Sequence, residues 1–158
     1  MDKAYEGKVV LVTGANSGIG EAIAVAFRKA GATVFGLGRR PEALQAARAR
    51  HPDIRWLRAD VANSKEVFAA VESAVQEAGR LDVVVNNAGL FKFAPLAQST
   101  EDLVRLQFEA NVYGTTYVTQ AALAALRASR GTIVNISSAA GHKPVPGGSQ
   151  TPNRYPDA

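Results

Sequence analysis

The sequence predicts an α/β domain whose doubly wound parallel sheet carries helices on both faces. Short apolar runs alternate with longer segments of helical periodicity along the 158 residues, and this alternation is typical of parallel sheets. The first run, at residues 8–13, holds the unbroken stretch Val9-Val10-Leu11-Val12, as expected of a strand buried on both faces. Right-handed crossovers then predict the strand order 3-2-1-4-5.

The remaining elements follow in turn along the chain. Strands are expected at residues 8–13, 33–37, 54–59, 81–86 and 131–136, and helices at residues 18–30, 41–50, 64–78, from Thr100, and 112–128. Pro41 suits the first turn of a helix, and Ser64 and Thr100 are the expected N-caps. Gly31 and Gly79 stand where helices commonly end.

Apolar positions at helical spacing identify the helix faces that we expect to point into the core. They are Ile19, Ile23, Ala26 and Phe27 in the first helix, Val67, Val71, Ala74 and Val75 in the third, and Leu103, Leu106 and Phe108 in the fourth. The polar stretch 150–158 contains Pro152 and Pro156, which interrupt any helix there. We therefore expect one domain over residues 1–149 and an irregular tail over residues 150–158.

The composition narrows the classes of function. There is no cysteine, which excludes disulfides and thiolate chemistry, and the two histidines are too few to indicate a metal site. The net charge of +4 is not accompanied by the aromatic platforms of a nucleic-acid surface. No run reaches the length of a membrane span and no secretory signal is recognisable, so we expect a cytoplasmic protein without nucleic-acid or membrane partners.

The turn after the first strand carries three glycines with separable functions. Gly14 allows a sharp turn, Gly18 allows the backbone to approach a pyrophosphate, and Gly20 allows the helix to pack closely on the sheet. Free N–H groups near Ile19 would then face the phosphates, and Asn16 and Ser17 add side-chain donors. A strand before the motif and a helix after it favour dinucleotide binding over a plain strand–turn–helix.

The end of the second strand discriminates between cofactors. An acid there would hold a ribose 2′-hydroxyl, whereas a base accommodates a 2′-phosphate. The sequence has Gly38-Arg39-Arg40 and no acid, and Arg39 can bind phosphate through a charge-assisted, bidentate contact. This predicts NADP in preference to NAD. For Arg40, a phosphate contact and a solvated position remain equally open.

Polar residues follow the third, fourth and fifth strands at the same carboxyl edge. Asp60, followed by Val61, can accept from an adenine amino group or cap its own loop. Asn87, Ala88 and Gly89 leave room for a ribose or adenine, although an Asx turn has the same composition. In the helical region Asn111 can bind a backbone carbonyl and distort the helix. After the fifth strand, Ser138 can present a hydroxyl near a nicotinamide or form a simple turn.

Together these segments resemble the short-chain dehydrogenase/reductase family, whose fold is of the Rossmann type. The resemblance covers residues 6–149 and the first three-fifths of a typical member. Its motifs are Thr13-Gly14-Ala15-Asn16-Ser17-Gly18-Ile19-Gly20, Asp60-Val61, Asn86-Asn87-Ala88-Gly89, Asn111-Val112-Tyr113-Gly114 and Val134-Asn135-Ile136-Ser137-Ser138-Ala139-Ala140-Gly141.

The resemblance implies hydride transfer between NADP(H) and an alcohol or carbonyl substrate. It implies that Ser138 holds the substrate oxygen, that Asn111 anchors a water in a proton relay, and that Arg39 marks a preference for NADP. The family's general acid/base is a Tyr followed four residues later by a Lys. Here Thr151 stands at the usual Tyr position, and Tyr155 has no such Lys after it.

From that departure we expect a Rossmann-type domain lacking the family's last strands, with an exposed fifth strand, without family-type dimers, and with cofactor binding but little turnover. A frameshift after residue 149 and a natural tail both remain open explanations. Two other functions also remain open: a non-catalytic dinucleotide-binding module and a non-functional gene fragment.

Overall fold

A five-stranded parallel sheet of order β3-β2-β1-β4-β5 forms the centre of the protein, as the sequence predicts. The structure is a computed structural model that describes residues 3–92 and 94–138. The strands are β1 (Val9–Thr13), β2 (Thr33–Gly38), β3 (Arg55–Arg58), β4 (Val83–Asn86) and β5 (Thr132–Asn135). The predicted tail, Tyr155 and residues 139–149 lie outside the described residues.

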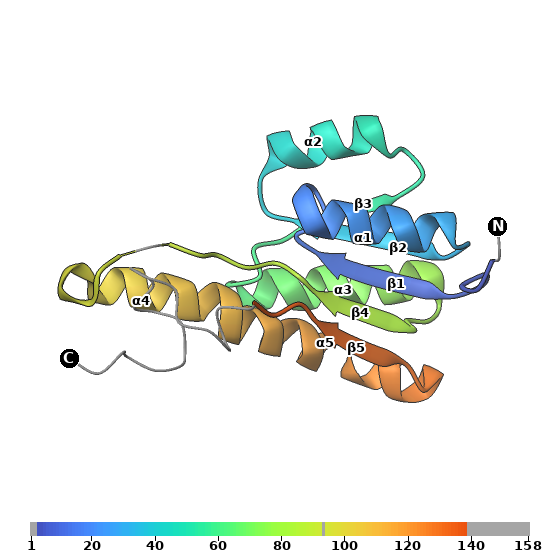
Figure 1. Ribbon diagram of the computed structural model, residues 1–158. Helices are drawn as coiled ribbons and strands as arrows, with labels where there is room; N and C mark the ends of the chain where they lie inside the picture. Colours follow the sequence, from blue (N-terminus) through green and yellow to red (C-terminus); the bar gives the residue numbers. More distant parts are fainter. Residues whose placement is uncertain (1–2, 93, 139–158) are drawn as a thin grey trace.

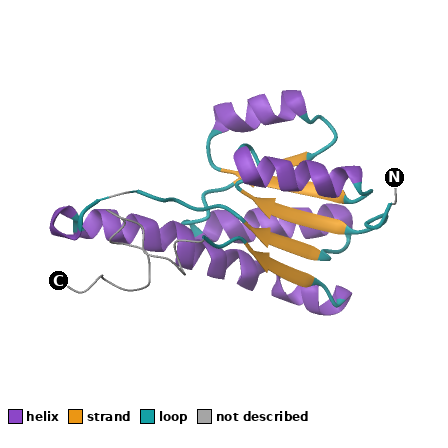
Figure 2. Ribbon diagram, in the orientation of Figure 1, coloured by secondary structure: helices purple, strands orange, loops and turns teal. Residues whose placement is uncertain are grey.

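Helices cover both faces of this sheet (Figures 1 and 2). The helices are α1 (Gly18–Lys29), α2 (Pro41–Arg50), α3 (Ser64–Ala78), α4 (Glu101–Phe108) and α5 (Gly114–Ser129), with a 3₁₀ turn at Leu96–Gln98 and a π-helix at Glu109–Tyr113. The core on one face joins Val10 and Val12 to α1 and α2. The core on the other face joins Leu11 to α3 and α5.

The strand β1 contributes to both cores because successive side chains of a strand point to opposite faces. All five of its residues are buried. It pairs with β2 on one side and with β4 on the other. The chain therefore leaves β1 in one direction toward β2 and β3 and later returns to β4, which places a crevice at the carboxyl ends of β1 and β4.

The helix caps confirm part of the prediction and correct part of it. Thr100 caps α4, since its Oγ1 accepts from the N–H of Leu103 at 3.2 Å. For α3 the predicted cap, Ser64, is wrong: Asn63 is the N-cap and its Oδ1 accepts from the N–H groups of Lys65 and Glu66. Gly79 ends α3 in the left-handed region, with φ +73°, as predicted.

Two predicted core stripes are wrong in part. Ile19 is 66% exposed, and the buried residues of α1 are Gly20 and Ala24. Leu106 and Phe108 of α4 are exposed, and the buried residue of that helix is Gln107. A helical stripe of apolar residues does not distinguish a side chain that faces the core from one that faces a cleft.

The last helix begins two residues later than expected because a π-helix precedes it. The π-helix spans Glu109–Tyr113 and includes Asn111, where the sequence predicts a distortion. The Asn111 amide does bind a backbone carbonyl, but that of Leu90, 21 residues away, and not one in its own helix. In the part of the chain that the structure describes, no helix has the length and hydropathy needed to traverse a bilayer.

Candidate cofactor site

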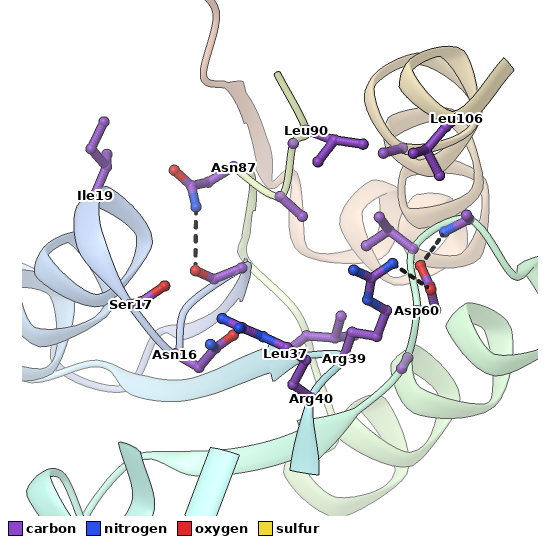
Figure 3. A pocket seen from close by; sticks show the side chains of 18 residues that line it. Asn16, Ser17, Ile19, Leu37, Arg39, Arg40, Asp60, Asn87, Leu90 and Leu106 are labelled. Carbon is purple, nitrogen blue, oxygen red and sulfur yellow. Dashed lines mark hydrogen bonds and ion pairs between the residues drawn. The ribbon is translucent and has the colours of Figure 1, made fainter. Parts of the chain in front are cut away.

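A pocket of about 390 Å³ opens at the carboxyl edge of the sheet (Figure 3). Its volume falls within the range of small-molecule sites, roughly 300–1,000 Å³. It is lined by Gly14, Asn16, Ser17, Ile19, Leu37, Gly38, Arg39, Arg40, Ala59, Asp60, Val61, Ala62, Asn87, Ala88, Gly89, Leu90, Leu106 and Ala110. The structure thus gathers most of the predicted cofactor residues around one cavity.

The three glycines of the first turn differ in their surroundings. Gly14 has φ +64° and lies against the segment that follows β4, since an added Cβ would be 3.0 Å from the Ala88 Cα atom. Gly20 is the most crowded, because a Cβ there would lie 2.4 Å from both the Gly14 carbonyl oxygen and the Asn87 amide nitrogen. Gly18 has φ +58°, and its added Cβ would meet no described atom within 4 Å. The open side at Gly18 leaves space for a ligand to reach the backbone.

Hydrogen bonds fasten this turn to the end of β4. The N–H groups of Asn87 and Ala88 donate to the buried Thr13 Oγ1 at 3.0 and 2.9 Å. The Asn87 amide nitrogen donates to the Thr13 carbonyl at 3.0 Å and also to the Gly14 carbonyl at 3.5 Å, the contact drawn in Figure 3. The side chain of Asn87 therefore holds the crevice in shape, and Ala88 and Gly89 supply its small-residue wall.

Charged groups gather where β2 and β3 end. Arg39 Nη1 lies 3.1 Å from Asp60 Oδ2, and Figure 3 shows this pair at the pocket. The other oxygen of Asp60 accepts from the N–H of Ala62 at 3.0 Å, so Asp60 caps its own loop while it lines the pocket. Arg40 also lines the pocket and forms no ion pair with any residue that the structure describes.

The two predicted catalytic residues lie outside the pocket lining. Asn111 makes two hydrogen bonds to Leu90: its Oδ1 accepts from the Leu90 N–H and its Nδ2 donates to the Leu90 carbonyl, each at 2.8 Å. These bonds anchor the pocket wall at Leu90. Ser138 follows β5 and is exposed. Neither the Tyr155 side chain nor the segment around it belongs to the described residues.

Several lining residues escape sequence reasoning. Leu106 lies on α4, where the helical stripe assigns it to the core, and Ala110 lies in the π-helix, in which the sequence predicts no site residue except Asn111. Leu90 could have been found from its position directly after Gly89. No group of three potential metal-ligating side chains occurs within residues 3–92 and 94–138.

Comparison with known proteins accounts for this combination of turn, crevice and sheet order. The family model described as short chain dehydrogenase matches residues 8–150. The chain belongs to this family. Its fold is also that of a short-chain dehydrogenase from Streptomyces avermitilis, with a TM-score of 0.79 at 40% identity over 86% of this chain and 51% of that one. Family members use NAD(P) cofactors in general.

Individual relatives differ in the substrates that their names state. The chain is 41% identical to 11-beta-hydroxysteroid dehydrogenase A of Sesamum indicum, over 89% of this chain and 42% of the relative. It is 37% identical to 3-ketodihydrosphingosine reductase of Bacteroides thetaiotaomicron, over 88% of this chain and 50% of the relative. The chain therefore spans about half the length of these short-chain dehydrogenase relatives.

Proposed function

We propose that this chain forms the cofactor-binding part of an NADP(H)-dependent short-chain oxidoreductase. Such an enzyme moves a hydride between the nicotinamide of the cofactor and the carbon of an alcohol or carbonyl substrate. The fold alone does not assign a function, so the proposal depends on the pocket. The names of the relatives support a small-molecule substrate but favour no single class.

One observation carries the preference for NADP. Arg39 and Arg40 line the same pocket as the glycine-rich turn, and β2 ends in Gly38 without an acidic residue after it. A carboxylate at this position would accept from a ribose 2′-hydroxyl and would repel a 2′-phosphate, whereas guanidinium groups attract the phosphate. Among the described residues, Arg40 has no carboxylate partner that a bound phosphate would have to displace.

The residues around the pocket can be assigned to the parts of the cofactor. Arg39 and Arg40 would hold the 2′-phosphate, and the turn from Gly14 to Gly20 with the start of α1 would hold the pyrophosphate. Asp60 and Val61 would face the adenine. The nicotinamide supplies the hydride donor or acceptor when it is bound. On the substrate side, the family resemblance assigns Ser138 to the substrate oxygen and Asn111 to a water.

Isothermal titration calorimetry with NADPH and NADH tests the proposal. We expect the protein to bind NADPH at least about tenfold more tightly, since charge-assisted contacts to one phosphate contribute on that order. Arg39→Ala should remove most of this difference. The matched control is Arg48→Ala, because Arg48 lies on α2 and contacts the Trp56 carbonyl outside the pocket. Equal affinity for both cofactors, or no binding of either, would contradict the proposal.

A further inference from the structure

An ionic cluster joins the first turn of α1 to the end of α2. Arg50 Nε and Nη2 donate to the two carboxylate oxygens of Glu21 at 2.9 and 3.1 Å. His51 Nε2 lies 2.8 Å from Glu21 Oε1. Arg50 thus makes the two-pronged contact that gives Arg–carboxylate pairs their defined geometry. None of these three residues lines the pocket.

The same guanidinium group reaches the glycine-rich turn itself. Arg50 Nη2 donates to the backbone carbonyl of Asn16 at 3.2 Å, and Asn16 lines the pocket. A peptide group is planar and trans, so fixing the direction of one carbonyl also fixes the N–H of the following residue. Arg50 therefore constrains the peptide between Asn16 and Ser17, which belongs to the segment expected to meet the pyrophosphate.

Glu21 places a negative charge close to that segment. Hydrogen bonding to Arg50 lowers the pKa of the Glu21 carboxyl, burial opposes this, and the contact with His51 adds to the lowering. Glu21 is therefore ionised at neutral pH. The N-terminal end of a helix attracts anions, but an unpaired carboxylate in the first turn of α1 would repel a pyrophosphate in the same place.

We propose that Arg50 is a positioning residue for the dinucleotide pyrophosphate. It acts through two partners, since it holds the Asn16 carbonyl in place and neutralises the Glu21 carboxylate. The inference rests on the proposed function in one respect, namely that the ligand of the pocket is a dinucleotide. Arg50 contributes equally to NADPH and NADH because the pyrophosphate is common to both, whereas Arg39 discriminates between them.

The test is a double-mutant cycle on cofactor affinity, measured by calorimetry with NADPH and with NADH. Arg50→Met should weaken the binding of both cofactors about five- to tenfold, because it loses a charge-assisted bond and exposes the Glu21 charge. Glu21→Gln should leave affinity unchanged or strengthen it about twofold. The variant Glu21→Gln with Arg50→Met should bind more tightly than Arg50→Met alone. A purely structural contact would not give this rescue.

Arg28→Met is the matched control for charge and exposure. Arg28 pairs with Asp53 at 2.9 Å from the other end of α1, and its side chain is 43% exposed against 48% for Arg50. We expect no change in affinity for this variant. If Arg50→Met fails to fold, Arg50→Lys and Glu21→Gln replace it. Arg50→Lys should then weaken the binding of both cofactors, but less than Arg50→Met would. The ammonium group keeps the charge but loses the two-pronged contact.

The possible failures are distinguishable. If the unaltered protein binds neither cofactor, the proposed function itself is wrong. If it binds and the folded Arg50 variants bind equally well, only the role of Arg50 is wrong. The role of Arg50 would also be wrong if Arg50→Met bound NADPH more weakly but NADH as tightly as the unaltered protein. It would be wrong as well if the double variant bound the cofactors no more tightly than Arg50→Met.

Discussion

Arg39 and Asp60 form an ion pair at the carboxyl edge of the sheet, with 3.1 Å between Nη1 and Oδ2. Both residues line the pocket, so the guanidinium expected to bind a 2′-phosphate already has an anionic partner there. A phosphate must share Arg39 with Asp60 or displace it. In the proposed assignment of the pocket, the ion pair would thereby couple the adenine side to the phosphate side.

Replacing Asp60 by Asn should sharpen the preference for NADPH. Asn keeps an oxygen that can accept from the Ala62 N–H, as Asp60 Oδ1 does, but it removes the charge that competes for Arg39. An exposed ion pair contributes up to about 1 kcal/mol, so NADPH affinity should rise about two- to fivefold. NADH affinity should not change in calorimetric titrations. A fall in NADPH affinity would show that Asp60 supports phosphate binding.

Replacing Gly18 or Gly20 by Ala should have different consequences, mainly for ligand affinity at Gly18 and mainly for stability at Gly20. Gly20→Ala places a Cβ 2.4 Å from the Gly14 carbonyl oxygen, and such overpacking costs about 1–3 kcal/mol of folding free energy. The Cβ of Gly18→Ala would meet no described atom within 4 Å. The main cost of this substitution is the strain of an Ala residue at φ +58°, about 1 kcal/mol of folding free energy. Its Cβ would occupy the open side of the turn, from which we expect the pyrophosphate to approach the backbone.

Thermal unfolding and calorimetry separate the two effects. Gly20→Ala should show the larger drop in Tm, and Gly18→Ala should show a loss of NADPH affinity that exceeds its loss of stability. The reverse order would mean that the ligand does not approach the turn at Gly18.

The pocket wall at Leu90 should depend on Asn111. Asn111→Ala removes both 2.8 Å hydrogen bonds to the Leu90 backbone, and because they are exposed we expect a loss of about 1 kcal/mol of stability. Asn111→Asp is the more specific test. It keeps the acceptor for the Leu90 N–H but replaces the amide donor by an oxygen, which repels the Leu90 carbonyl oxygen. Both variants should weaken NADPH binding. Unchanged binding with lowered Tm would limit Asn111 to a structural role.

The sequence is a good guide to the sheet and a poorer one to the side chains of the site. The β-branched run Val9–Thr13 and the alternation of strands and helices suffice for the strand order, because buried parallel strands leave little freedom of pairing. The contact between Arg39 and Asp60 and the cluster of Glu21 with Arg50 depend on rotamers of residues 21 and 29 positions apart. Periodicity carries no information about such contacts.

The burial of two apolar residues at the pocket is also mispredicted from the sequence, for a related reason. Ile19 and Leu106 stand at positions that a helical stripe assigns to the core, yet both line the pocket. A side chain that faces a ligand-sized cavity has the same spacing as one that faces other side chains. The place of Leu106 at the site becomes apparent only once α4 is positioned beside the crevice, whereas the glycine-rich motif already predicts a place near the phosphates for Ile19.

Asp82 should make the free energy of unfolding depend on pH in the acid range. Its side chain is 5% exposed and accepts from Arg80 at 2.6 and 2.8 Å, from the Val9 N–H at 3.0 Å and from Lys8 at 3.2 Å. Burial favours the neutral acid and raises the pKa of Asp82, but the bonds from Arg80, Val9 and Lys8 outweigh it and the net pKa is lowered.

The direction of that shift fixes the pH window. A carboxyl whose pKa is lower in the folded than in the unfolded state stabilises the fold above its unfolded pKa, about 4, and this contribution is lost as pH falls through the folded value. Asp82→Asn should therefore be less stable at pH 7 by about 2 kcal/mol, the scale of hydrogen bonds to a charged group. The difference from the unaltered protein should shrink below about pH 4.

Urea denaturation of both proteins between pH 7 and pH 2.5 measures this difference. Glu21→Gln serves as a comparison, because the pKa of Glu21 is also lowered but its partners are Arg50 and His51 and not the residues that bind Asp82. Its effect on the pH dependence should be smaller, since the Glu21 side chain is 21% exposed against 5% for Asp82 and the pair is therefore more strongly screened by solvent. A gap between Asp82→Asn and the unaltered protein that stays constant down to pH 2.5 would mean that Asp82 acts through packing and not through its charge.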